Sequence, residues 1–256
     1  MEKLNVKRLI ILCLPIVFAL SLAITLAACM AQAGKQMDDS ALDGSTTEAG
    51  ESETKKPIQS VWSEGLKYEK RSDGTAVVVG IGTCRDSYVK IPEKDPDGAR
   101  VIAIGDSAFI GNQSIRGVTL PTSLREIGAY AFYGSTLENI VIGASVEKIG
   151  ECCFASCKSL TSVTVDMANA KYSSIDGVLF SKDKTVLICY PSGKSDEEYT
   201  IRFGVESISS AAFYECVYLK KVKFNGKSED WDKVRIGANN TSLTSLQITF
   251  SKEDEK

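Results

Sequence analysis

The chain repeats one pattern of apolar positions along much of its length. An Ile-Gly pair followed by a small residue and Phe occurs at residues 104–109, 127–132 and 149–154, and more loosely at 208–213. Successive phenylalanines are therefore separated by 23, 22 and 59 residues. A repeat of about 20 to 50 residues is typical of a solenoid, because a single unit cannot bury its apolar face alone.

A second apolar pattern lies between these blocks and has the alternation of a β-strand. Its apolar residues stand two apart, so one side of each strand faces the core. The pairs are Val118 and Leu120, Ile140 and Ile142, Val163 and Val165, and Val222 and Phe224. Stacking such short strands from successive coils joins their buried residues into one core, which predicts a solenoid of parallel strands.

We expect each repeat Phe and the small residue before it to point into this core. The Gly-x-x-Ala-Phe segment then forms a tight turn or one turn of helix on the opposite side of the coil. The 59-residue interval equals one 23-residue period plus 36 residues. This extra length either adds coils or forms a projecting hairpin.

These motifs resemble the BspA-like (Treponema-type) leucine-rich repeats of bacterial surface proteins, whose unit runs I-G-x-x-A-F-x-x-C-x-x-L-x-x-V-x-L-P. Residues 101–165 match this unit closely. Residues 65–84 are similar to the family's lead-in, 172–191 to its long hairpin-bearing repeat and 231–250 to its closing unit. The resemblance implies an α/β-type, mostly β, right-handed leucine-rich-repeat solenoid of short parallel strands, with tight turns or short helices on the opposite face.

The N-terminus reads as a bacterial export signal. Basic residues precede an apolar run at 9–28. This run is long enough to span a bilayer, so an uncleaved membrane anchor is the alternative. The run ends in Leu-Ala-Ala-Cys at 26–29, which resembles a lipoprotein lipobox. The resemblance implies that Cys29 is lipidated and becomes the first residue of the mature chain.

Composition together with these resemblances divides the chain into six expected segments. Residues 29–60 are acidic and rich in Ser, Thr and Gly, so they cannot bury enough apolar area to fold and form a flexible tether. The full division is 1–28 lipoprotein signal peptide, 29–60 tether, 61–100 N-terminal capping hairpin and lead-in, 101–224 leucine-rich repeats with a long unit at about 166–200, 225–250 C-terminal capping unit, and 251–256 charged tail.

Charge and histidine content exclude several classes of function. The 30 Lys and Arg against 33 Asp and Glu give a net charge of −3, which argues against a nucleic-acid partner. The chain has no histidine. This absence removes Ser-His-Asp and Cys-His catalysis and any His-ligated metal centre. We therefore expect a protein that is not an enzyme and that takes neither a cofactor nor a small-molecule substrate.

The cysteines at 152, 153 and 157 form a C-C-x3-C cluster that permits a metal or redox site. The repeat register favours buried thiols instead. Cys153 stands at the inward Ala position, and Cys157 and Cys216 both follow a repeat Phe by three residues. A disulfide between Cys157 and Cys216 remains open if the unit between them loops out. The acidic runs at 196–198 and 229–230 fit solvated loops better than a catalytic carboxylate pair.

The outward side of the strand stack is the candidate binding surface, since solenoids commonly bind along such faces. Its outward positions are Gly117, Thr119, Asn139, Val141, Ser162, Thr164, Lys221 and Lys223. We expect a lipid-anchored cell-surface protein that binds a macromolecular ligand through this face, and the family resemblance implies adhesion. A structural spacer of the cell envelope without a dedicated ligand is the alternative, and a lipoprotein hydrolase is less favoured.

Overall fold

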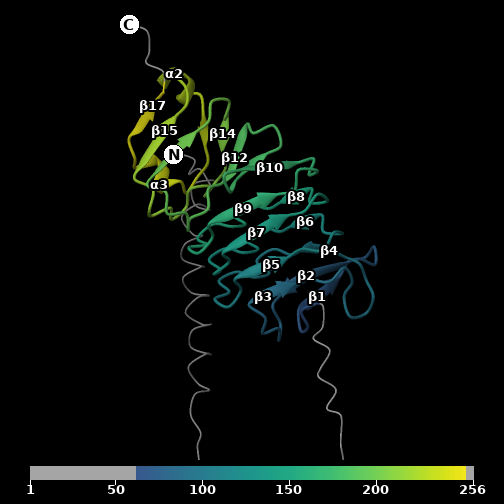
Figure 1. Cartoon of the computed structure of the whole chain (residues 1–256). Helices are drawn as coiled ribbons and strands as arrows, with labels where there is room; N and C mark the ends of the chain where they lie inside the picture. The colour runs from purple at the N-terminus through teal and green to yellow at the C-terminus, as the bar shows by residue number, and fades with distance from the viewer. Residues whose placement is uncertain (1–61, 252–256) are drawn as a thin grey trace, which may run out of the picture. The chain divides into compact units, whose positions relative to one another are not determined.

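The computed structural model describes residues 62–251 of the chain (Figure 1). The predicted signal peptide, the lipidation site Cys29, the tether and residues 252–256 lie outside the described residues. Within them, the regular structure is mostly β, as the repeat pattern predicts. The helices of this part are single turns, α2 at Ser228–Trp231 and α3 at Thr241–Thr244.

The alternating segments form a stack of parallel strands, which we call the outer stack. Its order is β3 (Tyr88–Lys90), β5 (Gly117–Thr119), β7 (Asn139–Ile142) and β9 (Ser162–Val165). Figure 1 shows these strands one above the other, each one coil further along the chain. The inward residues Val118, Ile140 and Val163 are buried, which confirms the predicted alternation.

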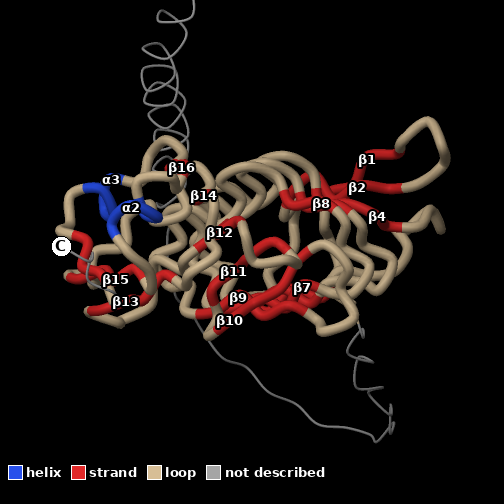
Figure 2. Tube along the Cα trace, turned by 90° about the horizontal axis from the view of Figure 1, so that it is seen from above, coloured by secondary structure: helices blue, strands red, loops and turns tan. Residues whose placement is uncertain are grey.

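A second stack contains the segments that end in the Ile of each Ile-Gly pair, preceded by the strands of the N-terminal hairpin. Its order is β1 (Lys67–Lys70), β2 (Ala76–Gly80), β4 (Val101–Ile104), β6 (Glu126–Ile127) and β8 (Lys148–Ile149). The strands from β2 onward are parallel, while β1 turns back as an antiparallel hairpin strand at the edge. Each coil thus gives one strand to each stack, and Figure 2 shows the two stacks on opposite sides of the coils.

The 59-residue interval contains both a hairpin and a further coil. The hairpin strands are β10 (Tyr172–Ile175) and β11 (Val178–Ser181). After it the two stacks resume as β12 (Val186–Cys189), β14 (Ser207–Ile208) and β16 (Arg235–Ile236) on one side, and β13 (Glu198–Ile201), β15 (Lys221–Phe224) and β17 (Ile248–Phe250) on the other. The extra coil is therefore β12–β13.

The Gly-x-x-Ala-Phe segments are turns that enclose a buried Phe. In each turn, the residues two before and two after the Phe adopt the left-handed region, with φ between 52° and 66°. These residues are Ser107 and Gly111, Tyr130 and Gly134, Cys152 and Ser156, and Ala211 and Glu215. The repeated conformation explains why two coils keep Gly after the Phe, since Gly adopts a positive φ without strain.

The buried side chains form two hydrophobic cores. Stacked rings run through them at centroid distances of 5.2 Å for Phe109 and Phe132, 5.8 Å for Phe132 and Phe154, and 5.2 Å for Tyr190 and Phe213. Strand β11 divides the cores, because Leu179 packs in the first and its neighbours Val178 and Phe180 pack in the second. All three of these side chains are buried.

The cysteines of the described residues are free thiols. Cys153, Cys157 and Cys216 are buried, which confirms their predicted inward positions. The possible Cys157–Cys216 disulfide is not formed, because the coil β12–β13 lies between the two residues. From this coil Ser192 Oγ donates to the Cys157 carbonyl at 2.9 Å, and the Cys216 thiol donates to the Tyr190 carbonyl at 3.7 Å.

Candidate binding surface

A groove of about 450 Å³ runs along the outward side of β5 and β7, and we call it the strand groove. Four of the predicted surface residues line it, namely Gly117, Thr119, Asn139 and Val141. The strand alternation turns these residues away from the core and the buried residues between them toward it. The rim is formed by the segments that follow β5, β7 and β9, including Pro121 and Thr122, Ser145, and Asp166.

Tyr88 forms one wall of the strand groove by lying over Gly117. A Cβ atom at Gly117 would stand 2.8 Å from Tyr88 Cδ1, so any other residue at 117 would displace the ring from this position. Gly117 is consequently buried despite its outward position, whereas Tyr88 is 59% exposed. The ring therefore replaces Gly117 as the group that a ligand meets at this end.

The hairpin closes the other end of this surface at β9. The Val163 amide donates to the Gly177 carbonyl at 2.9 Å, and the Val165 amide donates to Ser174 Oγ at 3.0 Å. Gly177 packs against Ser162, which is half-buried, while Thr164 stays exposed. The outer stack therefore presents its open face mainly over β5 and β7.

The two predicted lysines lie on a different sheet. Lys221 and Lys223 belong to β15, which pairs with β13 and β17, whereas the other six candidates belong to the sheet that ends at β9. The expectation of one continuous face is thus wrong, because the hairpin and β13 intervene. In the register of β13, Glu198 stands beside Lys221, so the basic character of this strip is partly offset.

Sequence reasoning missed Tyr88 as a surface residue. The stretch Val-Lys-Ile-Pro at 89–92 repeats the Val-Thr-Leu-Pro of 118–121, and this likeness marks residues 88–90 as a strand of the outer stack. The region carries neither the Ile-Gly nor the Ala-Phe block and falls within the predicted lead-in at 61–100. Tyr88 pairs in register with Gly117 across β3 and β5.

The thiols are held in their protonated form. Burial raises the pKa of Cys157 to about 11 and that of Cys216 to about 12, and it keeps the pKa values of Cys153 and Cys189 well above the ordinary value. Since the thiolate is the nucleophile and the metal ligand, these side chains act as core residues at neutral pH. Within residues 62–251 no group of acidic and cysteine side chains is arranged to hold a metal ion.

The acidic runs lie at the surface and pair with lysines. Asp196 Oδ2 is 3.2 Å from Lys194 Nζ, and Asp230 Oδ1 is 3.3 Å from Lys233 Nζ. Glu197 forms an ion pair with Lys220, which lowers the pKa of its carboxyl. Ion pairs between such exposed side chains contribute little to stability. Only Asp196 and Glu197 lie in a loop as the sequence predicts, because Glu198 begins β13 and Glu229 and Asp230 lie in α2.

No helix in the part of the chain that the structure describes is long and apolar enough to cross a membrane.

Comparison with solved structures finds bacterial repeat proteins. A leucine-rich cell surface protein from Faecalibacterium prausnitzii is 22% identical, covers 73% of this chain and 75% of its own, and gives a TM-score of 0.45. A leucine-rich repeat protein from Eubacterium ventriosum is 18% identical, with coverages of 75% and 72% and a TM-score of 0.39. The T. pallidum leucine-rich repeat protein is 19% identical, with coverages of 73% and 83% and a TM-score of 0.34.

A comparison with curated proteins finds no match. The model of the BspA type leucine rich repeat region, in contrast, matches with six copies over residues 88–195 and 189–252. These ranges include the outer stack, the hairpin and the closing coils. The matched residues make up more than half of the chain, and the chain therefore belongs to the BspA-type leucine-rich repeat family.

Proposed function

We propose that the protein is a lipid-anchored bacterial surface protein whose repeats bind another macromolecule, without catalysis, as in adhesion. The residues that line the strand groove are the main support for this proposal. It combines an exposed ring at Tyr88 and an exposed aliphatic group at Val141 with the short polar side chains of Thr119 and Asn139. An apolar centre with a polar rim is characteristic of protein interfaces, and aromatic residues commonly anchor them.

The rigidity of this surface favours a large ligand. The groove floor consists of backbone-paired strands, so its side chains change position little on binding. The exposed fractions of Tyr88 and Val141, 59% and 58%, leave substantial apolar area for a partner to cover. The groove is shallow and has few charges, which fits a protein surface better than a small charged metabolite.

Quantitative binding tests this proposal. The full-length protein in detergent is presented to immobilised extracellular-matrix proteins and to whole bacterial cells, beside variants Tyr88→Ala and Thr119→Glu. We expect saturable binding that each variant weakens at least tenfold. Thr164→Glu shows in addition whether the ligand extends to β9, and Lys223→Glu shows whether it extends past the hairpin.

Lys148→Glu is the matched control, because Lys148 is exposed on β8 in the opposite stack. It makes the same charge change as Lys223→Glu and is expected to leave binding unaltered. Binding that survives Tyr88→Ala and Thr119→Glu would move the site away from the strand groove. Absence of binding to every member of the panel would favour the structural spacer of the envelope.

The membrane anchor is tested separately through Cys29. Cells grown with a radiolabelled fatty acid are expected to label the wild-type protein and not Cys29→Ser. Cell fractionation is expected to leave Cys29→Ser in the soluble fraction if the signal is also cleaved. Continued lipid labelling of Cys29→Ser would refute the lipobox interpretation.

A further inference from the structure

The turns of successive coils are joined by a ladder of backbone hydrogen bonds. We number the coils by their strands, so that the second coil holds β4 and β5, the third β6 and β7, and the fourth β8 and β9. In the second and third coils, three alternate amides of the turn, those of the two left-handed residues and of the Phe between them, donate to carbonyls of the next coil. From the second coil to the third, the bonds are Ser107 to Ala129 at 2.9 Å, Phe109 to Ala131 at 2.7 Å and Gly111 to Tyr133 at 2.7 Å. From the third to the fourth, they are Tyr130 to Glu151, Phe132 to Cys153 and Gly134 to Ala155, each at 3.0 Å.

The ladder stops at the fourth coil. The equivalent amides are those of Cys152, Phe154 and Ser156, and among residues 62–251 none of them has a hydrogen-bond acceptor. Buried or half-buried amides without partners are uncommon, since each one costs free energy to desolvate. Phe154 is buried and Cys152 is half-buried, so these amides are not on a freely solvated surface.

The cause is a shortened turn in the coil β12–β13. The Leu187 carbonyl accepts from the Ser209 amide at 2.9 Å, as the Ile127 carbonyl accepts from the Gly150 amide at 2.8 Å, so Leu187 and Ile127 are equivalent. Tyr190 follows Leu187 by three positions, whereas Phe132 follows Ile127 by five. The turn of this coil is therefore two residues shorter than that of the third coil, and none of its carbonyls accepts from the amides of Cys152, Phe154 and Ser156.

The ladder resumes on the far side of this gap. Tyr190 takes the place of a repeat Phe, since its amide donates to the Ala212 carbonyl at 2.9 Å. The Ala211 amide donates onward to the Ala238 carbonyl at 2.7 Å. The Ser210 carbonyl faces the gap and receives a thiol hydrogen bond, from Cys152 Sγ at 4.0 Å. The amide donors of Cys152 and Phe154 on one side of the gap thus face the Ser210 carbonyl, an acceptor, on the other side.

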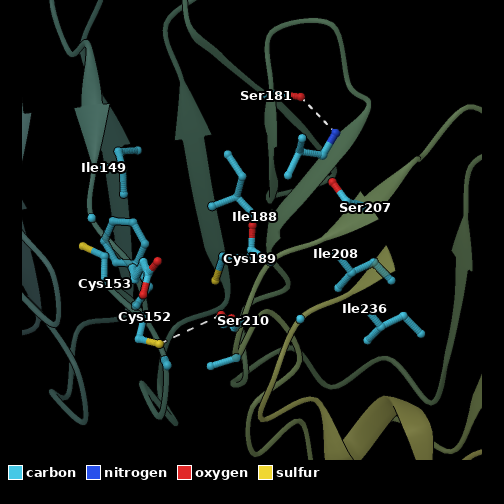
Figure 3. A pocket seen from close by; sticks show the side chains of 18 of the residues that line it. Ile149, Cys152, Cys153, Ser181, Ile188, Cys189, Ser207, Ile208, Ser210 and Ile236 are labelled. Carbon is cyan, nitrogen blue, oxygen red and sulfur yellow. Dashed lines mark hydrogen bonds between the residues drawn. The ribbon is translucent and has the colours of Figure 1, made fainter. Parts of the chain in front are cut away.

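A pocket of about 540 Å³ occupies this gap. Figure 3 shows Cys152 and Cys153 on one side of the pocket and Ile208 and Ile236 on the other, with Ile188 and Cys189 between them and a dashed line from Cys152 to Ser210. Coils two steps apart in such a stack lie about 10 Å apart, twice the spacing of paired strands, which leaves room for one extended backbone. The side chains of Ser156 and Glu215 bridge one end, so a ligand reaches Cys152 and Phe154 from the opposite end.

We propose that this pocket binds an extended peptide segment of a partner protein, whose backbone supplies the missing rung of the ladder. Its carbonyls accept from the amides of Cys152 and Phe154, and one of its amides donates to the Ser210 carbonyl. The residue that enters is small, because the corresponding residues of the third coil are Gly128 and Ala129. Strand addition of this kind draws affinity from the main chain and selectivity from side-chain size.

The pocket is a second site, separate from the strand groove of the proposed function. Its lining comes from the turns and from β12, β14 and β16, whereas the groove lies on β5 and β7. Loss of binding at one site therefore leaves the other intact. Tyr88→Ala, which alters only the groove, is the matched control for the experiments on the pocket.

Selection from a displayed library of random octapeptides tests the proposal. The full-length protein is compared with a variant in which Gly-Ala is inserted between Leu187 and Ile188, at the positions of Gly128 and Ala129, which restores the five-residue spacing and is expected to fill the gap. We expect peptides enriched on the wild-type protein and on Tyr88→Ala, but not on the insertion variant. Ile188→Arg places a long side chain on the pocket floor and is expected to abolish peptide binding as well. It tests the proposal independently if the insertion variant does not fold.

The selected peptides are then tested on Cys152. This thiol is half-buried, while the other described cysteines are buried, so N-ethylmaleimide reports on the pocket. Saturating peptide is expected to slow alkylation of Cys152 at least tenfold, and N-methylation of one central peptide amide is expected to weaken binding at least tenfold. The proposal is overturned if the library yields no peptide specific to the open pocket, or if bound peptides leave the alkylation of Cys152 unchanged.

Discussion

The side-chain oxygen of Asn240 accepts the backbone amide of Phe213 at 2.8 Å, in the place where a carbonyl of a further coil would stand. In the third coil the corresponding amide, that of Phe132, donates to the Cys153 carbonyl at 3.0 Å. Asn240 Nδ2 also donates to the carbonyls of Ser209 at 3.0 Å and Gly237 at 2.8 Å. One buried carboxamide thus joins the last two turns and satisfies a buried amide of the ladder.

Replacing Asn240 with Leu is expected to lower the free energy of unfolding by about 3 kcal/mol, because it leaves the Phe213 amide and the Gly237 carbonyl without their partner and removes one of two donors to the Ser209 carbonyl. Urea denaturation of the full-length protein measures this change. Asn225→Leu, at an exposed position, is the control and is expected to change stability by less than about 0.5 kcal/mol. Equal effects of the two substitutions would refute the joining role of Asn240.

Gly134→Ala is expected to lower the free energy of unfolding by about 1 kcal/mol, through its effect on backbone conformation alone. Its φ is +66°, and the nearest atom to an added Cβ is 3.9 Å away, so the methyl group meets no clash. Gly143→Ala is the control, since a Cβ there has no neighbour within 4 Å among the described residues and φ is not in the left-handed region. Thermal unfolding distinguishes them, and a neutral Gly134→Ala would contradict the requirement for the left-handed conformation.

Gly150→Ala tests the close approach of the coils. A Cβ at this position would lie 2.2 Å from the Ala129 backbone nitrogen, so the fourth coil must move away from the third. Backbone atoms cannot move aside as a side chain can. We therefore expect Gly150→Ala to lower the free energy of unfolding by about 3 kcal/mol, clearly more than Gly134→Ala does. Unfolding by urea measures the difference, and a loss no larger than that of Gly134→Ala would show that the coils separate easily.

Stability is expected to fall at alkaline pH because of the buried thiols. Their pKa values, about 11 for Cys157 and about 12 for Cys216, lie above those of the unfolded chain, so unfolding releases protons once the pH exceeds about 9. The decrease in the free energy of unfolding is absent below that pH, and it grows until the pH reaches the folded-state pKa values of the thiols. At pH 10 each thiol accounts for about 1 kcal/mol.

Urea denaturation at pH 7.5 and pH 10, under reducing conditions, tests this dependence. The double variant Cys157→Ala and Cys216→Ala is less stable at pH 7.5 because it loses packing, but its stability is expected to decline less with pH. A double variant with the same decline as the wild-type protein would assign the dependence to other groups, such as buried tyrosines.

The sequence predicted most of the fold because its repeats encode local geometry. The alternation at Val118 and Ile140 defines the strands, and the Phe spacing defines the coils. The sequence does not predict where the coils that lack the repeat motif lie in the stack. The turn that ends in Tyr190 has neither the Ile-Gly nor the Ala-Phe block, so its place in the stack becomes clear only from hydrogen bonds such as that between Tyr190 and Ala212.

The candidate surface shows the same limit. Periodicity alone identifies Thr119, Asn139 and Val141 as outward residues, and the structure places all three along one groove. Periodicity does not reveal that Tyr88 covers Gly117, because this depends on which strands are neighbours. The hairpin that separates Ser162 from Lys221 likewise follows from tertiary packing, which a local pattern does not encode.

The strand β11, buried on both faces between two cores, makes the energetic effects of distant substitutions independent. Phe132 and Phe213 pack in different cores, so Phe132→Leu and Phe213→Leu add in their effects on stability. Phe109 and Phe132 share one core with ring centroids 5.2 Å apart, so substitutions of these two residues depart from additivity. Substitutions that accumulate in one core therefore leave the packing of the other core unchanged.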